Sequence, residues 1–188
     1  IIFLLTRSYV VWSSKRWRPL LPSGWKTHSL SWIKRPSRRK VRNGRGKSCI
    51  VSRTKIFIDT NILIYTVDAH DAEKQIRARS IVKSVVENDL PVISTQILQE
   101  FYSASTTKLK VDPLIAKNLV HNFGNMEVVP VDPHTIEQGI DISILCRISF
   151  WDGLVVAAAE QGNCEILFSE DLNSGQTIRG IKILNPFF

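Results

Sequence analysis

Four acidic residues of this chain have a type and spacing that could support chemistry on a phosphate group. Asp59 and Asp171 each follow a short strand-like run, Glu100 lies within a helical pattern, and Asp152 opens an Ala-rich helical pattern. Carboxylates held within a few ångströms of one another repel, and they need a cation if all are to stay ionised. Their hard oxygens suit Mg²⁺ or Mn²⁺, which can activate water and clamp a phosphate. If the fold brings the four together, they predict metal-dependent hydrolysis of phosphodiesters.

The stretch around Asp59 also has a purely structural interpretation. Residues 55–58 are typical of a buried strand, and a helical pattern starts directly after Asp59. Asp is a good N-cap, so Asp59 could serve only to begin that helix. It also stands at the carboxyl end of a strand, which is where open α/β sheets bind ligands. Both interpretations stay open until the positions of the other acids are known.

From Lys55 onward, short strand patterns alternate with longer helical patterns. The expected strands are 55–58, 91–94, 127–131, 165–168 and 181–184. The expected helices are 71–87, 96–108 with Thr95 as its cap, one that opens at Asp112-Pro113, 132–147 and 151–161. This alternation predicts an α/β fold with helices on both faces of a central, mostly parallel sheet of about five strands.

The first 54 residues differ sharply from the rest. They hold 14 of the 25 Lys and Arg residues, four of the five Trp residues and none of the 17 Asp and Glu residues. They show no lasting hydrophobic period, and three hypotheses fit: an RNA-binding arm, a disordered extension, or translated upstream sequence with the natural start at Val51. We expect residues 1–54 to be a dispensable extension and residues 55–188 to be the functional domain.

The spacing of the cysteines and the length of the apolar runs exclude several classes of protein. Cys49, Cys146 and Cys164 form no CxxC pair and have no nearby His at ligand spacing. We therefore expect neither a disulfide framework nor a zinc site, and we expect a cytoplasmic protein. The apolar run 1–5 is too short to span a bilayer, so no membrane partner is expected.

Several motifs taken together resemble a known family. They are Ile58-Asp59-Thr60-Asn61, Leu98-Gln99-Glu100-Phe101, the segment 151–159 that begins Trp-Asp-Gly, Ser169-Glu170-Asp171-Leu172 and Asn185-Pro186-Phe187. Over residues 55–188 the chain resembles a PIN-domain nuclease, and most of all a VapC-type toxin of a bacterial toxin–antitoxin pair. Residues 1–54 have no counterpart in that family.

The resemblance implies a compact three-layer α/β/α sandwich, Mg²⁺-dependent endoribonuclease activity, a homodimer, and inhibition by a small antitoxin protein. It also implies roles for seven residues: metal-binding catalytic acids at Asp59, Glu100, Asp152 and Asp171, and orienting polar groups at Asn61, Ser169 and Asn173. The role of Asn173 is open, because relatives often carry another polar or acidic residue there.

Some residues have plainer expectations. Glu170 is expected to point away from its neighbour Asp171 into solvent. Gly153 stands where relatives commonly have Ala, and we expect it to loosen its helix slightly. The basic residues of the helix 71–87 could contact RNA phosphates, but a solvated helix face is the favoured interpretation.

Other functions are also compatible with an acid-edged α/β domain. An inactive PIN-fold scaffold is the main alternative, although four intact acids argue against it. A response-regulator domain is expected to have Lys, not Asn185, before Pro186, and a phosphatase with an Asp-x-Asp nucleophile requires Asp where Asn61 stands. A metal-dependent endoribonuclease remains the first hypothesis.

Overall fold

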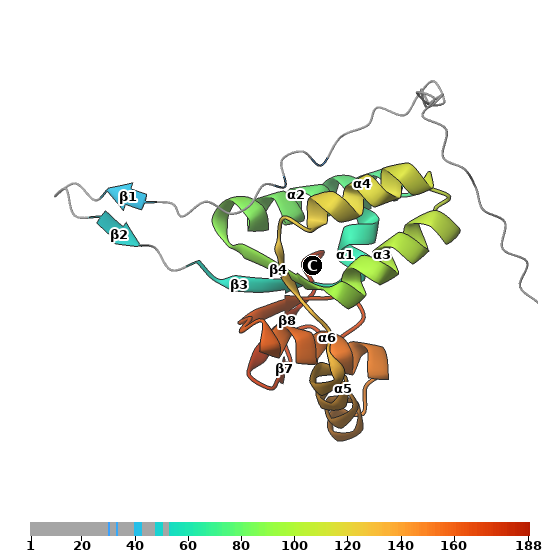
Figure 1. The fold of residues 1–188 in the computed structure, drawn as a ribbon. Coiled ribbons are helices and arrows are strands. Elements are labelled where there is room, and N and C mark those ends of the chain that lie inside the picture. The colour runs from blue at the N-terminus through green and yellow to red at the C-terminus, as the bar shows by residue number, and fades with distance from the viewer. Residues whose placement is uncertain (1–29, 31–32, 34–39, 43–47, 51–52) are drawn as a thin grey trace, which may run out of the picture.

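A central parallel sheet organises the molecule (Figure 1). The computed structural model describes residues 30, 33, 40–42, 48–50 and 53–188. The strands are β1 (Lys40–Arg42), β2 (Ser48–Ile50), β3 (Lys55–Ile58), β4 (Leu90–Ser94), β5 (Glu127–Val129), β6 (Ile166–Phe168), β7 (Thr177–Ile178) and β8 (Ile181–Leu184). The helices are α1 (Thr60–Tyr65), α2 (Ala72–Asn88), α3 (Thr95–Thr107), α4 (Pro113–Phe123), α5 (Pro133–Cys146) and α6 (Phe150–Gln161).

The main sheet has six strands in the order β5-β4-β3-β6-β8-β7. All neighbours are parallel except β7 and β8, so the expected mostly parallel sheet is confirmed and the expected count of about five is one too few. The added strand, β7, has only two residues and joins β8 through a turn at Arg179 and Gly180, both with positive φ. Such turns suit tight hairpins, and two residues are too few to show a period in the sequence.

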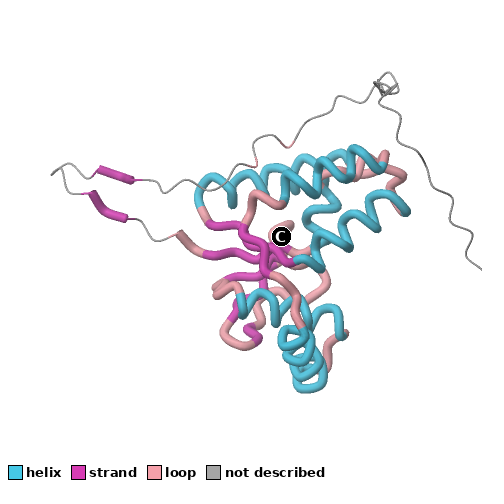
Figure 2. Tube along the Cα trace, in the orientation of Figure 1, coloured by secondary structure: helices cyan, strands magenta, loops and turns pink. Residues whose placement is uncertain are grey.

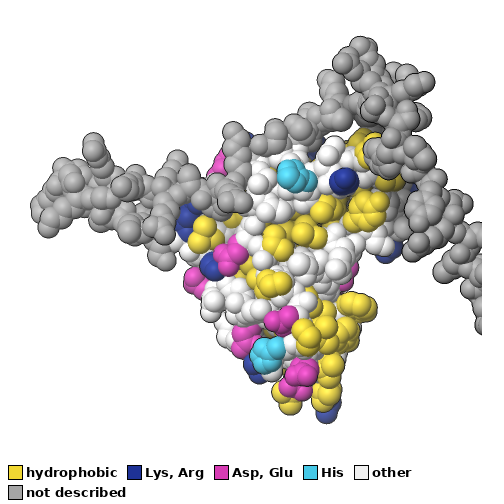
Figure 3. Space-filling model, viewed as in Figure 1, with side chains coloured by type: hydrophobic (Ala, Val, Ile, Leu, Met, Phe, Trp, Pro, Cys, Tyr) yellow, Lys and Arg dark blue, Asp and Glu magenta, His cyan; other side chains and the backbone are white. Residues whose placement is uncertain are grey.

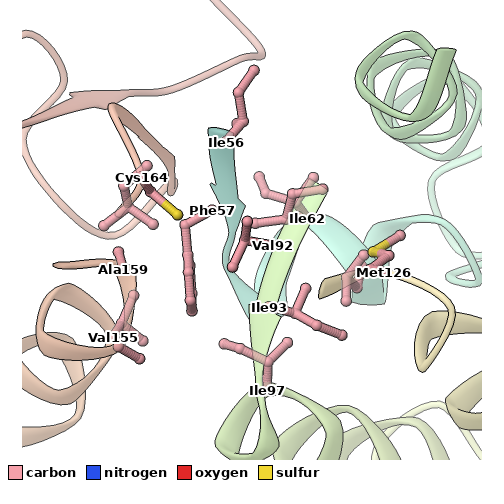
Figure 4. Close-up of a cluster of buried hydrophobic side chains, with 14 of the residues drawn as sticks. Ile56, Phe57, Ile62, Val92, Ile93, Ile97, Met126, Val155, Ala159 and Cys164 are labelled. Atoms are coloured by element: carbon pink, nitrogen blue, oxygen red, sulfur yellow. The ribbon is translucent and has the colours of Figure 1, made fainter. Parts of the chain in front are cut away.

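Helices cover both faces of the sheet and produce three layers. In Figures 1 and 2, α1, α2, α3 and α4 lie on one side of the strands, and α5 and α6 lie on the other. Figure 4 shows Phe57 of β3 pointing toward Val155 and Ala159 of α6, while Ile62 and Ile93 lie on the opposite side. Because β3 is buried on both faces beyond Lys55, its last three residues, 56–58, form a continuous apolar run.

Polar caps begin the helices close to the expected positions. Asp112 and Asp132 each accept hydrogen bonds from the first turn of a helix that starts with Pro. The expected cap at Thr95 is wrong by one residue: the Ser94 side chain accepts from the Ile97 N–H, and the Thr95 hydroxyl accepts from the Val131 N–H. Thr95 therefore ties α3 to the segment after β5.

Two glycines let α5 and α6 approach closely. A Cβ atom added at Gly153 would lie 2.4 Å from the Gly139 carbonyl oxygen, and one added at Gly139 would lie 2.9 Å from the Leu154 Cα. The expectation that Gly153 merely loosens its helix is therefore wrong, because the absence of a side chain is what allows this contact. The small-residue helix α6 is held against the sheet and against α5 at once.

The outer face of α5 is apolar. Exposed side chains lie at helical spacing on it, namely Ile136, Ile140, Ile144 and Leu145. Figure 3 shows hydrophobic side chains gathered over this part of the molecule. Within the described residues, no single helix has the length and apolar character to cross a membrane, and only α5 and α6 taken together, bent by 119°, reach that length and composition.

Parts of the segment 1–54 fall within the described residues. β1 and β2 pair antiparallel, although no strand was expected there. Leu30 and Ile33 are only 2% and 3% exposed and belong to the hydrophobic core, and Asn125 donates a hydrogen bond to the Ile33 carbonyl. Apart from Arg53 and Thr54, the rest of the predicted extension, including Val51, lies outside the described residues, so its dispensability stays a prediction.

Shortening the chain to residues 51–188 tests that prediction. If the extension is dispensable, the free energy of unfolding stays unchanged. If the two buried apolar side chains matter, their loss lowers it by about 3 kcal/mol or more. Urea unfolding of the full and shortened chains distinguishes these outcomes. The full chain with Leu30→Ala and Ile33→Ala shows whether those two side chains account for any loss.

We expect Gly153→Ala to lower the free energy of unfolding by about 1–3 kcal/mol, because its Cβ overpacks the α5–α6 contact. Helix propensity alone predicts the opposite sign, a gain of up to about 1 kcal/mol. The sign of the change in the free energy of unfolding, measured with urea, therefore distinguishes overpacking from helix propensity. Gly124→Ala is a milder comparison, since its Cβ would lie 3.2 Å from the His121 carbonyl oxygen, a tight contact but a much longer one than at Gly153. A more stable Gly153→Ala protein would contradict the packing argument.

Candidate active site

A cavity of about 290 Å³ opens at the carboxyl ends of the central strands. All four acids singled out from the sequence line it, although they come from four separate elements or loops. The lining residues are Asp59, Thr60, Asn61, Ile64, Tyr65, Gln96, Glu100, Ala104, Lys108, Trp151, Asp152, Val155 and Asp171. The parallel arrangement of β3, β4 and β6 places these segments at one edge.

Asp59 is the most buried of the four acids, at 7% exposure. Its Oδ1 accepts from the Thr60 N–H at 2.6 Å, and its Oδ2 accepts from the Ser169 hydroxyl at 2.7 Å. It caps α1 and lines the cavity, so the structural and functional interpretations of this residue are compatible. Burial raises the pKa of Asp59 from 3.8 to about 6; the two hydrogen bonds lower it, and the charges of Asp171 and Glu100 raise it further.

Glu100 projects from α3 with both carboxylate oxygens engaged. Oε2 accepts from the Thr60 hydroxyl at 2.6 Å, and Oε1 accepts from the Gln96 side-chain amide at 2.8 Å. Gln96 was missed by the sequence analysis, although its place four residues before Glu100 on one helix face is a usable signal. Thr60 holds Asp59 through its N–H and Glu100 through its hydroxyl, so one residue orients two acids.

Asp171 and Asp152 lie on the more open side of the cavity. Asp171 Oδ2 accepts from the Asn61 amide at 3.1 Å, and the Asp171 N–H donates to the Ser169 hydroxyl oxygen at 3.2 Å. Asp152 lies in the first turn of α6, where its carboxylate accepts from the Ser149 hydroxyl at 2.7 Å. Ser149 also caps this helix, a contact that sequence analysis did not identify.

Two polar residues expected to orient the acids do contact them, and a third does not. Asn61 and Ser169 hold Asp171 and Asp59 as described above. Asn173 is exposed, does not line the cavity, and makes no side-chain hydrogen bond to any of the four acids. Its expected orienting role has no geometric support.

Two other expectations are wrong. Glu170 is half-buried, with 27% of its side chain exposed, and it pairs with Lys74 at 2.7 Å instead of lying free in solvent. Lys74 and Arg79 of α2 therefore do not belong to a fully solvated face: Arg79 donates to the Thr66 carbonyl at 2.7 Å. The basic residue that does line the cavity is Lys108, at the end of α3.

The donor set fits a hard divalent cation in its chemistry. Two amide oxygens from the lining residues, Asn61 Oδ1 and Gln96 Oε1, are buried without a hydrogen-bond partner in the described part of the chain. An unpaired buried oxygen costs about 1–3 kcal/mol, which a bound ion or its water ligands could offset. As they stand, no three His, Cys, Asp or Glu side chains among the described residues are close enough together to hold an ion. The cavity thus offers oxygen ligands that would have to draw closer around a cation.

The raised pKa of Asp59 gives a pH dependence of stability in metal-free buffer. The folded protein holds this proton more tightly than the unfolded chain, so the stabilisation is complete below about pH 4 and lost as the pH rises through about 6. The effect is about 3 kcal/mol in size. We expect Asp59→Asn to remove this decline between pH 4 and 7 in urea unfolding, and Asp141→Asn, an exposed acid on α5, to keep it. If the free energy of unfolding falls equally with pH in the wild type and in Asp59→Asn, the decline does not come from Asp59.

The model of the PIN domain family matches residues 56–176. No curated protein sequence matches the chain.

Solved structures are also similar to this chain, and the two with a TM-score above 0.5 share its fold. A toxin–antitoxin complex from Klebsiella pneumoniae is similar with a TM-score of 0.53 and 14% identity, over 70% of this chain and 97% of that one. VapBC2 from Rickettsia felis, bound to a DNA fragment from its promoter, has a TM-score of 0.51 and 17% identity, over 69% and 97%. VapC20 of Mycobacterium tuberculosis, a sarcin–ricin loop cleaving toxin, has a TM-score of 0.48 and 20% identity, over 62% and 91%. With the family model covering most of the chain, and with the parallel sheet and acid-lined cavity in place, this protein belongs to the PIN domain family.

Proposed function

We propose that this protein is an endoribonuclease that uses Mg²⁺ or Mn²⁺, and that it is the toxin of a toxin–antitoxin pair. The proposal rests on one observation: four carboxylates line a single cavity within a PIN domain. Clustered acids are unfavourable unless a cation meets them, so their presence together supports a role in metal binding.

Asp59, Glu100, Asp152 and Asp171 would hold the metal. When bound, the ion would supply an activated water and positive charge for the phosphate. Asp59 is held by Ser169 and Thr60 on opposite oxygens, which fixes the carboxylate plane before a substrate arrives. Lys108, the one basic residue among the lining residues, would attract the RNA phosphates.

The toxin assignment is an analogy with the similar Klebsiella and Rickettsia complexes, both of which contain an antitoxin. It implies a small protein inhibitor, which copurification from the native host would reveal. The homodimer is proposed from the resemblance to VapC-type toxins, and the exposed apolar face of α5 supports it, since such faces are often protein contacts. A cytoplasmic location is proposed from the cysteine pattern.

An inactive scaffold remains the second candidate. The observation in its favour is that no three acids among the described residues stand at metal-binding separation. Against it stand the hydrogen bonds that orient all four carboxylates at the cavity. A scaffold has no need for acids aimed at a common space, so the nuclease is favoured.

Asp152→Asn separates the nuclease from the scaffold. The Asp152 carboxylate accepts its hydrogen bond from Ser149 at the start of α6, and Asn at this position keeps the backbone N–H that bonds to the Ser149 cap. We expect RNA cleavage to fall by about a hundredfold or more, as for other groups that stabilise transition-state charge. We also expect Mg²⁺ to stabilise the wild type by about 2.7 kcal/mol at a hundred times its dissociation constant, and the variant by less. Asp141→Asn is the matched control, with full cleavage. Full activity of Asp152→Asn, or no effect of millimolar Mg²⁺ on melting, would count against the nuclease.

A further inference from the structure

A cluster of side chains lies directly behind Asp171 and is not part of the cavity chemistry described so far. Glu170, the preceding residue, accepts hydrogen bonds from Lys74 Nζ at 2.7 and 3.0 Å and from the Tyr65 hydroxyl at 2.5 Å. Lys74 and Glu170 each have 27% of the side chain exposed. The cluster therefore joins α1, α2 and the loop after β6, which are far apart in the sequence.

Aromatic contacts complete this cluster. The Lys74 ammonium lies 3.8 Å from the centroid of the Tyr65 ring, a cation–π contact. The Phe187 ring meets Tyr65 edge-on with centroids 5.6 Å apart, and Arg77 donates to the Phe187 carbonyl. Tyr65 also lines the cavity, so one face of the cluster borders the acids.

Asp171 itself has few restraints. It is exposed, its carboxylate accepts one bond of 3.1 Å from Asn61, and its N–H donates one of 3.2 Å to Ser169. β6 ends at Phe168, so no strand pairing holds the backbone at residues 170 and 171. Because neighbouring residues share a peptide unit, anchoring Glu170 on one side restricts where the Asp171 carboxylate can lie on the other.

We propose that Lys74 and Tyr65, acting through Glu170, are positioning residues that hold Asp171 at the cavity. We call Lys74, Tyr65 and Glu170 the clamp. This inference rests on the proposed function, since it assigns the clamp a purpose in metal binding. Partly exposed ion pairs contribute little to global stability, about 0–1 kcal/mol, so the main effect of the clamp is expected in the geometry of the site. Groups that orient metal ligands commonly change metal affinity or activity by about 10–100-fold.

The test uses the full chain and four variants. Lys74→Met removes the ammonium and keeps a flexible stem, Tyr65→Phe removes only the hydroxyl, and Lys74→Arg keeps the charge. Lys83→Met is the matched control, because Lys83 lies on the same helix and pairs with Glu87 at 3.8 Å, with both side chains more than half exposed. Two quantities are measured: the Mg²⁺ dissociation constant, from the dependence of the melting temperature on Mg²⁺ concentration, and kcat and KM for RNA cleavage.

We expect Lys74→Met to raise the Mg²⁺ dissociation constant about tenfold or more and to lower kcat similarly, with little change in KM. Tyr65→Phe shows a smaller change in the same direction, while Lys74→Arg and Lys83→Met stay within about twofold of wild type. If Lys74→Met does not fold, the milder Tyr65→Phe still reports on the clamp.

A purely structural role gives a different result: melting temperatures fall without Mg²⁺, and the Mg²⁺ dissociation constant stays at the wild-type value. That outcome would overturn the positioning role while leaving the nuclease intact. A wild type that neither binds Mg²⁺ nor cleaves RNA would overturn the proposed function, and the positioning role with it.

Discussion

The buried carboxylate of Asp59, at the end of the central strand β3, sets the constraint on which the site depends. A carboxylate with 7% exposure loses most of its hydration, and the structure compensates only in part, with the Ser169 hydroxyl and the Thr60 N–H. Ser169 comes from the end of β6, so the pairing of β3 with β6 brings donor and acceptor together. The cost that remains, expressed in the raised pKa of Asp59, is what a cation would relieve.

Positioning of the other acids depends on packing at some distance from the cavity. Asp152 precedes Gly153, the residue whose missing side chain allows α6 to approach α5. The helix that carries Asp152 is therefore located by a backbone contact on its other side. Glu100 similarly depends on α3, whose start is held by Ser94 and whose first residue, Thr95, is tied to the segment after β5. Glu100 and Asp152 thus lie within helices, Asp59 lies at the junction of β3 and α1, and Asp171 lies on the loop after β6.

Much of the fold could be predicted because its signals are local. Short β-branched runs mark buried strands, and Asp-Pro pairs at 112–113 and 132–133 mark helix starts. The antiparallel strand β7 escaped because two residues carry no period. The burial of Leu30 and Ile33 could not be predicted for a related reason: two apolar residues in a segment without a hydrophobic period do not indicate what they pack against.

For the site, the sequence by itself determined the four acids and their local places: Asp59 and Asp171 after strands, Asp152 at a helix start, and Glu100 within a helix. Parallel strands share a carboxyl edge, so this could be inferred without distances. Only the tertiary structure decided how those acids are held. The hydrogen bond of Ser169 to Asp59 spans 110 positions, and that of Lys74 to Glu170 spans 96. Contacts of such separation leave no periodic trace in the chain, because they arise when helices and strands pack, and that packing also determines which side of a loop each side chain faces.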